Sequence, residues 1–176
     1  MGSVSASVVS HASCPVVVVR EDNHVTESTK YGPVVVGVDG SEVSQKATAY
    51  AFREAQARGA ALIAVHTWMD MQVQASLAGL SAAQSEWADI EKEQSELLAE
   101  NLKEPREEYP DVEVKQLITR DRPVSALTEA AEGAQLLVVG SHGRGGFKGM
   151  LLGSTSRALL QSAPCPMMVV RPDEDN

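Results

Sequence analysis

The chain has 176 residues, of which 43% are hydrophobic and 22% charged, and this composition is typical of a globular protein rather than a disordered or fibrous one. The length allows one domain of ordinary size with little left over, and such a domain can bury a core without disulfides or metals. The formal net charge of −9 argues against nucleic acid and against an anionic membrane surface as partners.

Cysteine use and the length of the apolar runs indicate the compartment. Cys14 and Cys165 have no metal-ligand spacing, and two thiols make a poor framework for a secreted domain. We expect both to be buried, reduced thiols, and a disulfide between them is the alternative. No run approaches the roughly 18–20 apolar residues that a membrane helix needs, and Val16–Val19 lacks the basic segment of an export signal. The sequence therefore predicts a cytoplasmic protein without a membrane segment.

The first twenty residues repeat a segment near the other end of the chain. Gly2–Arg20 (GSVSASVVSHASCPVVVVR) aligns without gaps with Gly153–Arg171 (GSTSRALLQSAPCPMMVVR), and the Gly-Ser start, the Cys-Pro pair and the final arginine coincide. We call this match the terminal repeat. The alternative is chance similarity between two short segments rich in Val and Ser. A match in this register predicts the same last helix and strand in two related domains.

The terminal repeat suggests how the chain is divided. Residues 1–20 are expected to be the remnant of a preceding homologous domain, and the polar residues 21–32 a linker. The main domain then covers residues 33–171, and residues 172–176 form a tail.

The main domain begins with a pattern of buried strands separated by a helix. Strands are expected at Pro33–Val38 and Ala61–His66, because both are continuous apolar runs. Between them the pattern predicts a helix that Ser41 caps and Gly59 ends. His66, at the end of its strand, is expected to be a core histidine with its hydrogen bonds satisfied.

A longer helix should follow the capping-box signature of Ser81 and Gln84 and stop before Tyr109. Its apolar stripe, expected to be buried, consists of Trp87, Ile90, Leu97, Leu98 and Leu102.

The remaining segments complete an alternating pattern. Val112–Ile118 is expected to be an edge strand, Pro123–Glu132 a helix, Gln135–Val139 a buried strand, Gly153–Ser162 a helix and Met167–Val170 the last strand. Strands separated by helices predict right-handed crossovers and a parallel sheet covered on both faces. Ligands of such sheets bind beyond the carboxyl ends of the strands, where the strand order reverses.

A glycine-rich loop follows the fourth strand predicted in the main domain. In Val138–Leu159 (VVGSHGRGGFKGMLLGSTSRAL) a buried strand leads through this loop into a helix that begins with Gly-Ser-Thr. Glycines let the backbone approach a ligand, and the free N–H groups of a helix start favour phosphate. Arg144 and Lys148 supply cations. The loop has neither the Gly-Lys-Ser/Thr triplet of a P-loop nor the first-strand position of a dinucleotide fingerprint. A surface loop with incidental glycines is the alternative.

The spacing Gly140-x2-Gly143-x9-Gly153-Ser154 resembles the G-x2-G-x9-G-[S/T] pattern of ATP-binding universal stress proteins. The resemblance includes VVVGVDGS at Val34–Ser41 and AVHTW at Ala64–Trp68, and it covers Pro33–Arg171. It implies an α/β fold with a five-stranded parallel sheet of order 3-2-1-4-5 and helices on both faces, similar to the adenine-nucleotide α-hydrolases and Rossmann-like. Gly2–Arg20 then resembles the tail of the first unit of a tandem member.

The resemblance also implies the ligand and its contacts. ATP, with Mg²⁺, would bind where the strand order reverses. Asp39 would bind the ribose or help to hold the metal, and the backbone around Thr67 would meet the adenine. As an alternative, Asp39 merely turns the chain together with Gly40. The implied nucleotide-binding residues are Gly37, Val38, Asp39, Thr67, Val139, Gly140, His142, Gly143, Arg144, Gly145, Gly153, Ser154 and Thr155.

No nucleophile–base–acid set accompanies the loop, which argues against strong catalysis. Together with the resemblance, this implies a regulatory module of the stress response that binds ATP, with weak hydrolysis left open. One alternative is a nucleotide-activating enzyme of the α-hydrolase type. The other is a nucleotide-free assembly module. Because family members often pair their last strands, we predict that Cys14–Arg20 docks antiparallel beside Met167–Arg171 of its own or a neighbouring chain. This would produce a homodimer or a tandem-domain pair, and the protein partner downstream stays unknown.

Overall fold

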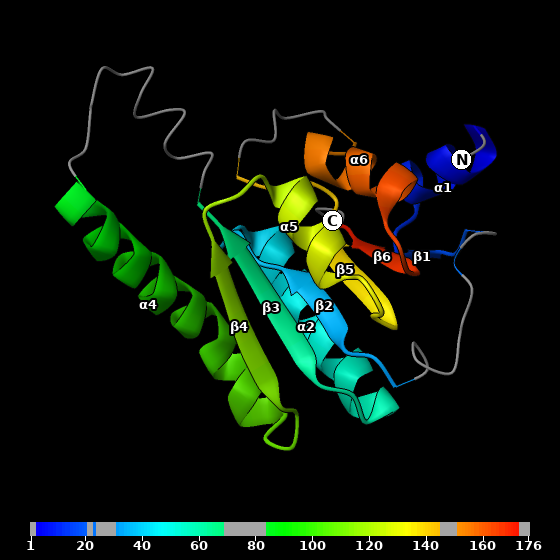
Figure 1. Ribbon diagram of the computed structural model, residues 1–176. Helices are drawn as coiled ribbons and strands as arrows, with labels where there is room; N and C mark the ends of the chain where they lie inside the picture. The colour runs from blue at the N-terminus through cyan, green and yellow to red at the C-terminus, as the bar shows by residue number, and fades with distance from the viewer. Residues whose placement is uncertain (1–2, 21–22, 24–30, 69–83, 145–150, 173–176) are drawn as a thin grey trace.

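The computed structural model describes residues 3–20, 23, 31–68, 84–144 and 151–172. A six-stranded mixed sheet lies at the centre, with helices on both faces (Figure 1). The strands are β1 (Val16–Val18), β2 (Val34–Gly37), β3 (Leu62–Thr67), β4 (Val114–Thr119), β5 (Leu136–Gly140) and β6 (Met167–Val170). The helices are α1 (Ser3–His11), α2 (Glu42–Arg58), α4 (Gln84–Glu108), α5 (Pro123–Ala130) and α6 (Ser154–Ser162).

The order across the sheet is β1-β6-β5-β2-β3-β4. The resemblance implies a sheet of five parallel strands, and the count is wrong: β2 to β6 are parallel, and β1 adds an antiparallel sixth strand that makes the sheet mixed. Counted within residues 33–171, β2 to β6 have the implied order 3-2-1-4-5. From β2 the chain first winds outward through β3 to β4, and it then returns to the other side of β2 for β5 and β6. The strand order therefore reverses between β2 and β5.

Strand β1 lies along β6 of the same chain. The paired residues are Val16 with Val169, Val17 with Met168 and Val18 with Met167. An edge strand offers a row of unpaired backbone groups, and a β-branched run such as residues 16–19 readily extends to meet them. The predicted antiparallel docking of Cys14–Arg20 beside Met167–Arg171 is therefore confirmed, and the pairing is within one chain.

Each face of the sheet has its own core. Helices α2 and α4 cover one face, where Phe52 of α2 and Leu102 of α4 are fully buried. Helices α5 and α6 cover the other, with Leu127 and Leu159 at the centre of that core. Helix α1 adds Val9 to the second core and lies beside α6 in Figure 1. Burial on both faces explains why β2, β5 and β6 are continuous apolar runs.

The helix ends of α2 follow the predicted chemistry. The Ser41 hydroxyl accepts a hydrogen bond from the Ser44 N–H, and Gly59 ends the helix with φ of +59°.

Helix α4 differs from its predicted pattern. Leu98 and Leu102 are buried, but Leu97 is 40% exposed, so the prediction that it is buried is wrong. Gln94 occupies the buried stripe instead, one turn before Leu98. Adjacent residues of a helix point about 100° apart, so two neighbouring leucines cannot both face the sheet. The side chain of Trp87 lies outside the described residues.

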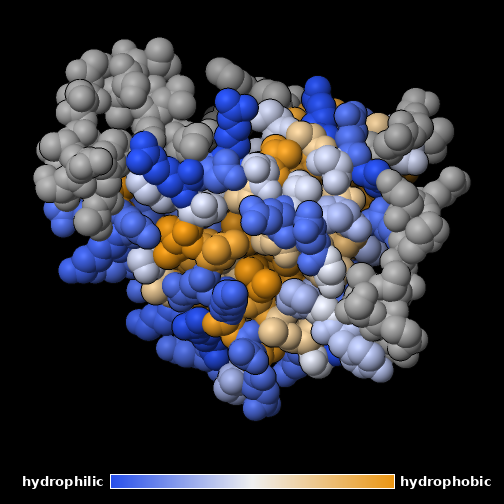
Figure 2. Space-filling view, viewed as in Figure 1, coloured by the Kyte–Doolittle hydropathy of each residue, from blue (hydrophilic) through white to orange (hydrophobic). Residues whose placement is uncertain are grey.

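Part of the sheet reaches the surface. Figure 2 shows hydrophobic atoms gathered over β3 and β4, on the face that α5 and α6 cover only in part. Ile63 and Leu117 are half-buried there and pack against the core of that face. None of the described helices combines the length and the apolarity that crossing a membrane requires.

Candidate functional site

Three predicted site segments lie at the carboxyl ends of neighbouring strands of the sheet. Val38 and Asp39 come directly after β2, Thr67 ends β3, and Gly140 ends β5. Since β2 pairs in parallel with both β3 and β5, the carboxyl ends of the three strands lie side by side (Figure 1). The strand order reverses between β2 and β5, and the carboxyl ends of the strands at such a point are the usual position of a ligand.

Asp39 connects three segments at the carboxyl ends of the strands. Its Oδ1 accepts a hydrogen bond from the Ser41 N–H at 2.9 Å, and its Oδ2 accepts one from the Arg144 N–H at 3.3 Å. The Asp39 N–H donates to the Ser44 hydroxyl at 3.0 Å. The carboxylate therefore joins the end of β2 to the start of α2 and to the loop after β5.

Two glycines allow this close approach. A Cβ on Gly143 would overlap Oδ2 of Asp39, and a Cβ on Gly40 would lie 2.7 Å from the Arg144 guanidinium. Gly40 also has φ of +79°, which favours glycine. Only glycine at position 143 lets the loop lie directly against the carboxylate. The Arg144 guanidinium thus lies over the turn that carries Asp39.

The start of α6 packs against the end of β5 and the first part of the loop. Gly153 is the N-cap and offers no side-chain cap, so the first N–H groups of the helix, at Ser154 and Thr155, have no intrahelical partner. The Gly153 N–H donates to the Ser141 carbonyl at 2.7 Å, and the Ser156 hydroxyl donates to the Gly140 carbonyl at 2.7 Å. These bonds hold the helix start against the end of β5.

Ser141 and His142 form the first part of the loop. Ser141 is fully buried, and its N–H donates to the Val170 carbonyl at 2.7 Å. Its hydroxyl lies 3.0 Å from Nδ1 of the half-buried His142. A Cβ on Gly153 would lie 3.2 Å from the Cα of His142, so the two ends of the loop are packed together. His142 therefore has a contact within the loop, as its position beside the glycines suggests.

Gly37, Val38 and Val139 can offer only backbone groups to a ligand. Val38 and Val139 are buried, and a Cβ on Gly37 would lie 3.2 Å from a methyl group of Leu127, so packing against α5 explains this glycine. Thr67 is half-buried and lies level with the residues after β2, since Gly37 pairs with Val65. Gly145 and Lys148 lie outside the described residues.

Sequence reasoning missed a buried pair behind the site. His66 Nδ1 lies 2.7 Å from the Val38 carbonyl oxygen, and Nε2 lies 3.0 Å from the side-chain oxygen of Gln94. Both side chains are buried, which confirms His66 as a satisfied core histidine. Gln94 shares the helical stripe of Leu98 and Leu102. A polar residue on an apolar stripe was the signal that could have identified it.

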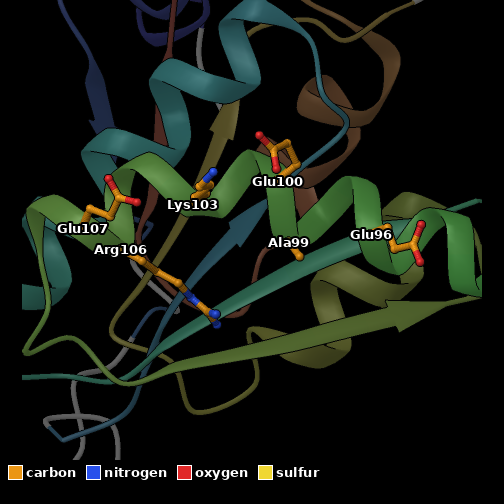
Figure 3. Close-up of a pocket in the computed structure, with 6 residues that line it drawn as sticks. All are labelled: Glu96, Ala99, Glu100, Lys103, Arg106 and Glu107. Carbon is orange, nitrogen blue, oxygen red and sulfur yellow. The ribbon is translucent and has the colours of Figure 1, made fainter.

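A separate hollow lies along α4. Figure 3 shows its lining residues projecting from this one helix: Glu96, Ala99, Glu100, Lys103, Arg106 and Glu107. Arg106 points toward β4 and donates to the Val114 carbonyl at 3.3 Å. Alternating charges on one helix are typical of a solvated face. Among the described residues, no group of three or more His, Cys, Asp or Glu side chains could hold a metal ion.

The fold and this loop match one protein family. The model of the universal stress protein family matches residues 30–171. The chain is 48% identical over 171 residues to universal stress protein Rv2005c of Mycobacterium tuberculosis (strain ATCC 25618 / H37Rv). The aligned region covers 97% of this chain and 56% of that protein. The chain therefore belongs to the universal stress protein family. It spans about half the length of the curated relatives that it matches.

Solved structures have the same fold. The universal stress protein UspA from Lactobacillus plantarum superposes with a TM-score of 0.65 at 23% identity, over 80% of this chain and 98% of that one. A universal stress protein in complex with cAMP superposes with a TM-score of 0.55 at 27% identity, over 80% of this chain and 96% of that one. The similarity thus extends to a family member that binds a nucleotide.

Proposed function

We propose that this chain binds ATP between the carboxyl ends of β2 and β5, and that it acts as a nucleotide-dependent regulatory module of the stress response rather than as an efficient enzyme. The main support for this proposal is that one loop, the loop after β5, contacts both Asp39 and the start of α6. This arrangement brings a hydrogen-bond acceptor and a set of phosphate-binding donors to one place.

Asp39 has the capacity to bind sugar or metal. Each of its oxygens accepts one backbone hydrogen bond, from Ser41 or Arg144, and a carboxylate oxygen has a second lone pair for a further donor. A ribose hydroxyl could donate to it. Mg²⁺, which proteins usually bind through one or two carboxylates plus substrate phosphates, could also be held there.

The opposite side of the site fits phosphate. The first N–H groups of α6 favour an anion, and the hydroxyls of Ser154 and Thr155 add donors. Arg144, whose guanidinium lies against Gly40, would contribute a cation from the loop after β5. Gly143 and Gly153 keep the backbone free of side chains at the points of closest approach. These groups would hold the phosphates and stabilise their charge.

The adenine side would use backbone groups near Val38 and Thr67. The His66–Gln94 pair fixes the Val38 carbonyl, and therefore fixes the backbone that an adenine ring would meet. The similar family member bound to cAMP, an adenine nucleotide, supports this class of ligand. Phosphates held by Arg144 and by the start of α6 would contact the chain on both sides of residues 145–150. We expect nucleotide occupancy to change the surface that this region presents to a protein partner.

The test is calorimetric titration of the nucleotide-free protein with Mg-ATP. We expect micromolar binding, weakened at least tenfold (about 1.4 kcal/mol) by Asp39→Asn. Glu42→Gln is the matched control: it removes the same charge from an exposed side chain three residues away and should leave binding unchanged. Gly143→Ala should abolish binding, because its Cβ would displace the Asp39 carboxylate.

Two outcomes would overturn the proposal. If a protein that melts cooperatively binds neither ATP nor cAMP, the nucleotide-free assembly module is the better description. Rapid consumption of ATP, reduced by Asp39→Asn but not by Glu42→Gln, would instead establish an enzyme.

A further inference from the structure

The hydrogen-bond ladder between β2 and β3 stops before β3 does. Its last paired residues are Gly37 and Val65, and its last bond runs from the Val38 N–H to the Val65 carbonyl at 2.8 Å. Strand β3 continues to Thr67. In a parallel ladder the next bond would join the Thr67 N–H to the Val38 carbonyl. Among the described residues no such bond forms, so the ladder lacks one bond beside the candidate site.

The Thr67 N–H nevertheless faces the carboxyl end of β2. Along a strand, the backbone groups of successive residues point alternately to the two neighbouring strands. The Trp68 N–H donates to the Thr119 carbonyl of β4 at 3.4 Å, whereas the Val65 carbonyl accepts from β2. Thr67 lies one residue before Trp68 and two after Val65, and it therefore directs its N–H away from β4 and toward the candidate site.

The side chain of His66 takes the carbonyl that the ladder leaves unused. Its Nδ1 lies 2.7 Å from the Val38 carbonyl oxygen, at the short end of the range for such bonds, and the ring is buried. The other ring nitrogen contacts Gln94 of α4, so the ring lies on the face of the sheet that α4 covers. A carbonyl that turns toward this ring turns out of the plane of the sheet and away from Thr67.

The hydrogen that makes this bond must be on Nδ1 of His66. The Val38 carbonyl can only accept, and a neutral imidazole has a single N–H. Gln94 can serve as donor or as acceptor, because a half-turn of its amide exchanges the oxygen and the amino group. Its amino group then donates to Nε2 and fixes the tautomer. A charged ring is disfavoured, because both side chains are buried and neither partner carries a charge.

We propose that His66 is a positioning residue for base recognition: by holding the Val38 carbonyl, it leaves the Thr67 N–H free to donate to a nucleobase. This role rests on the proposed nucleotide site and adds to it a preference among bases. A free N–H favours a base with an unprotonated ring nitrogen, such as N1 of adenine. Guanine and hypoxanthine carry a hydrogen on N1, so they present a donor to a donor. Without His66, the Thr67 N–H would bond to the Val38 carbonyl and the base would lose its partner.

The first test needs no nucleotide and follows the hydrogen exchange of single amides by NMR. In the chain itself the Thr67 amide should exchange at least about tenfold faster than the Val38 amide, which is bonded to Val65. Replacing both buried partners, His66→Leu with Gln94→Leu, leaves no polar group unpaired and frees the Val38 carbonyl. In this double variant the Thr67 amide should join the ladder and exchange about as slowly as that of Val38.

His66→Asn is the matched control. Its side-chain amide can place an N–H where Nδ1–H lies, although it has no ring and is smaller. The Thr67 amide should therefore remain fast in this variant. A role in packing alone would group His66→Asn with the double variant, whereas the positioning role groups it with the unchanged chain.

The second test compares ATP with ITP by calorimetric titration, since hypoxanthine is the base of ITP. The chain should bind ATP at least about tenfold more tightly than ITP. The double variant should lose this preference through weaker binding of ATP, with ITP changed by less than about twofold, and His66→Asn should keep it. General damage to the fold would weaken both nucleotides alike, so the ratio isolates the contact with the base.

Three results would contradict this role of His66. One is a Thr67 amide in the unchanged chain that is as protected as the Val38 amide. Another is a His66 ring with its hydrogen on Nε2, detected from the nitrogen chemical shifts. The third is the same ratio of ATP to ITP affinity in the double variant and the unchanged chain, which would leave ATP binding itself intact. If neither nucleotide binds, the proposed function fails and base recognition fails with it, whereas the Thr67 amide still decides whether His66 ends the ladder.

Discussion

The pairs α1–β1 and α6–β6 have matching sequences and matching secondary structure but different surroundings. In α6–β6 most of the apolar side chains are buried, whereas in α1–β1 Val9 is buried and Val8, Val17 and Val19 are exposed. The matching sequences therefore form the same helix, turn and strand in two different settings. The energy gained by burial depends on the neighbouring elements. Substitutions at aligned positions separate these two contributions.

The largest expected difference is between Leu159→Ala and Val8→Ala. Leu159 is fully buried beneath α5, and its truncation should lower the free energy of unfolding by about 2–5 kcal/mol through lost burial and the cavity left behind. Val8 is half exposed, so its truncation should cost less than about 0.5 kcal/mol. Urea unfolding at equilibrium measures both. Equal costs would show that α1 is packed as tightly as α6.

A second difference concerns the two thiols. Burial raises the pKa of Cys165 to about 11, so its reactive thiolate is scarce at neutral pH, whereas Cys14 is exposed. At about pH 7.5 a thiol reagent should modify Cys14 at least about 100-fold faster than Cys165. As long as the pH stays below 11, each increase of one pH unit should raise the thiolate fraction of Cys165, and with it the reaction rate, by about tenfold.

Mass spectrometry of peptides after timed labelling identifies which cysteine has reacted. In denaturant the two thiols should react at similar rates, which is the control for intrinsic reactivity. Equal rates in the folded protein would contradict the difference in burial.

The smallest expected difference is between Ser156→Ala and Ser5→Ala. The buried Ser156 hydroxyl donates to the Gly140 carbonyl at 2.7 Å, and its removal leaves that carbonyl without this donor at a cost of about 1–2 kcal/mol. Ser5 aligns with it but is exposed, so its removal should change the stability by less than about 0.5 kcal/mol. Thermal melts monitored by circular dichroism can resolve the two. If Ser156→Ala were neutral, the bond would not hold the start of α6.

Much of the fold follows from the sequence because its signals are local. The apolar runs, the Ser41 cap, the Gly59 stop and the edge position of β4 are all properties of short segments. The sheet has six strands rather than the implied five because antiparallel β1 is added to it by its own chain, and the sequence left open whether the partner was this chain or a neighbour. The burial of Gln94 depends on His66, a partner in another element, and helical periodicity cannot reveal such a pairing.

The candidate site was predictable as a set of segments but not as a geometry. The glycine spacing identifies the loop, and the strand ends place it beside Asp39. Gly143 lies against the Asp39 carboxylate, and Gly37 packs against Leu127. Both contacts depend on distances between elements, which the spacing of residues along the sequence does not encode. The prediction that Cys14 is buried is wrong because it rested on the apolar run that follows, not on what covers that run.

The position of β6 between β1 and β5 has a consequence for its amide hydrogen exchange. Amides bonded toward β5 lie in the central sheet and should exchange only when the whole domain unfolds. Amides bonded toward β1 exchange whenever that short strand and α1 detach, which needs far less of the structure to open. A single strand of four residues should therefore show two protection levels, alternating from one amide to the next.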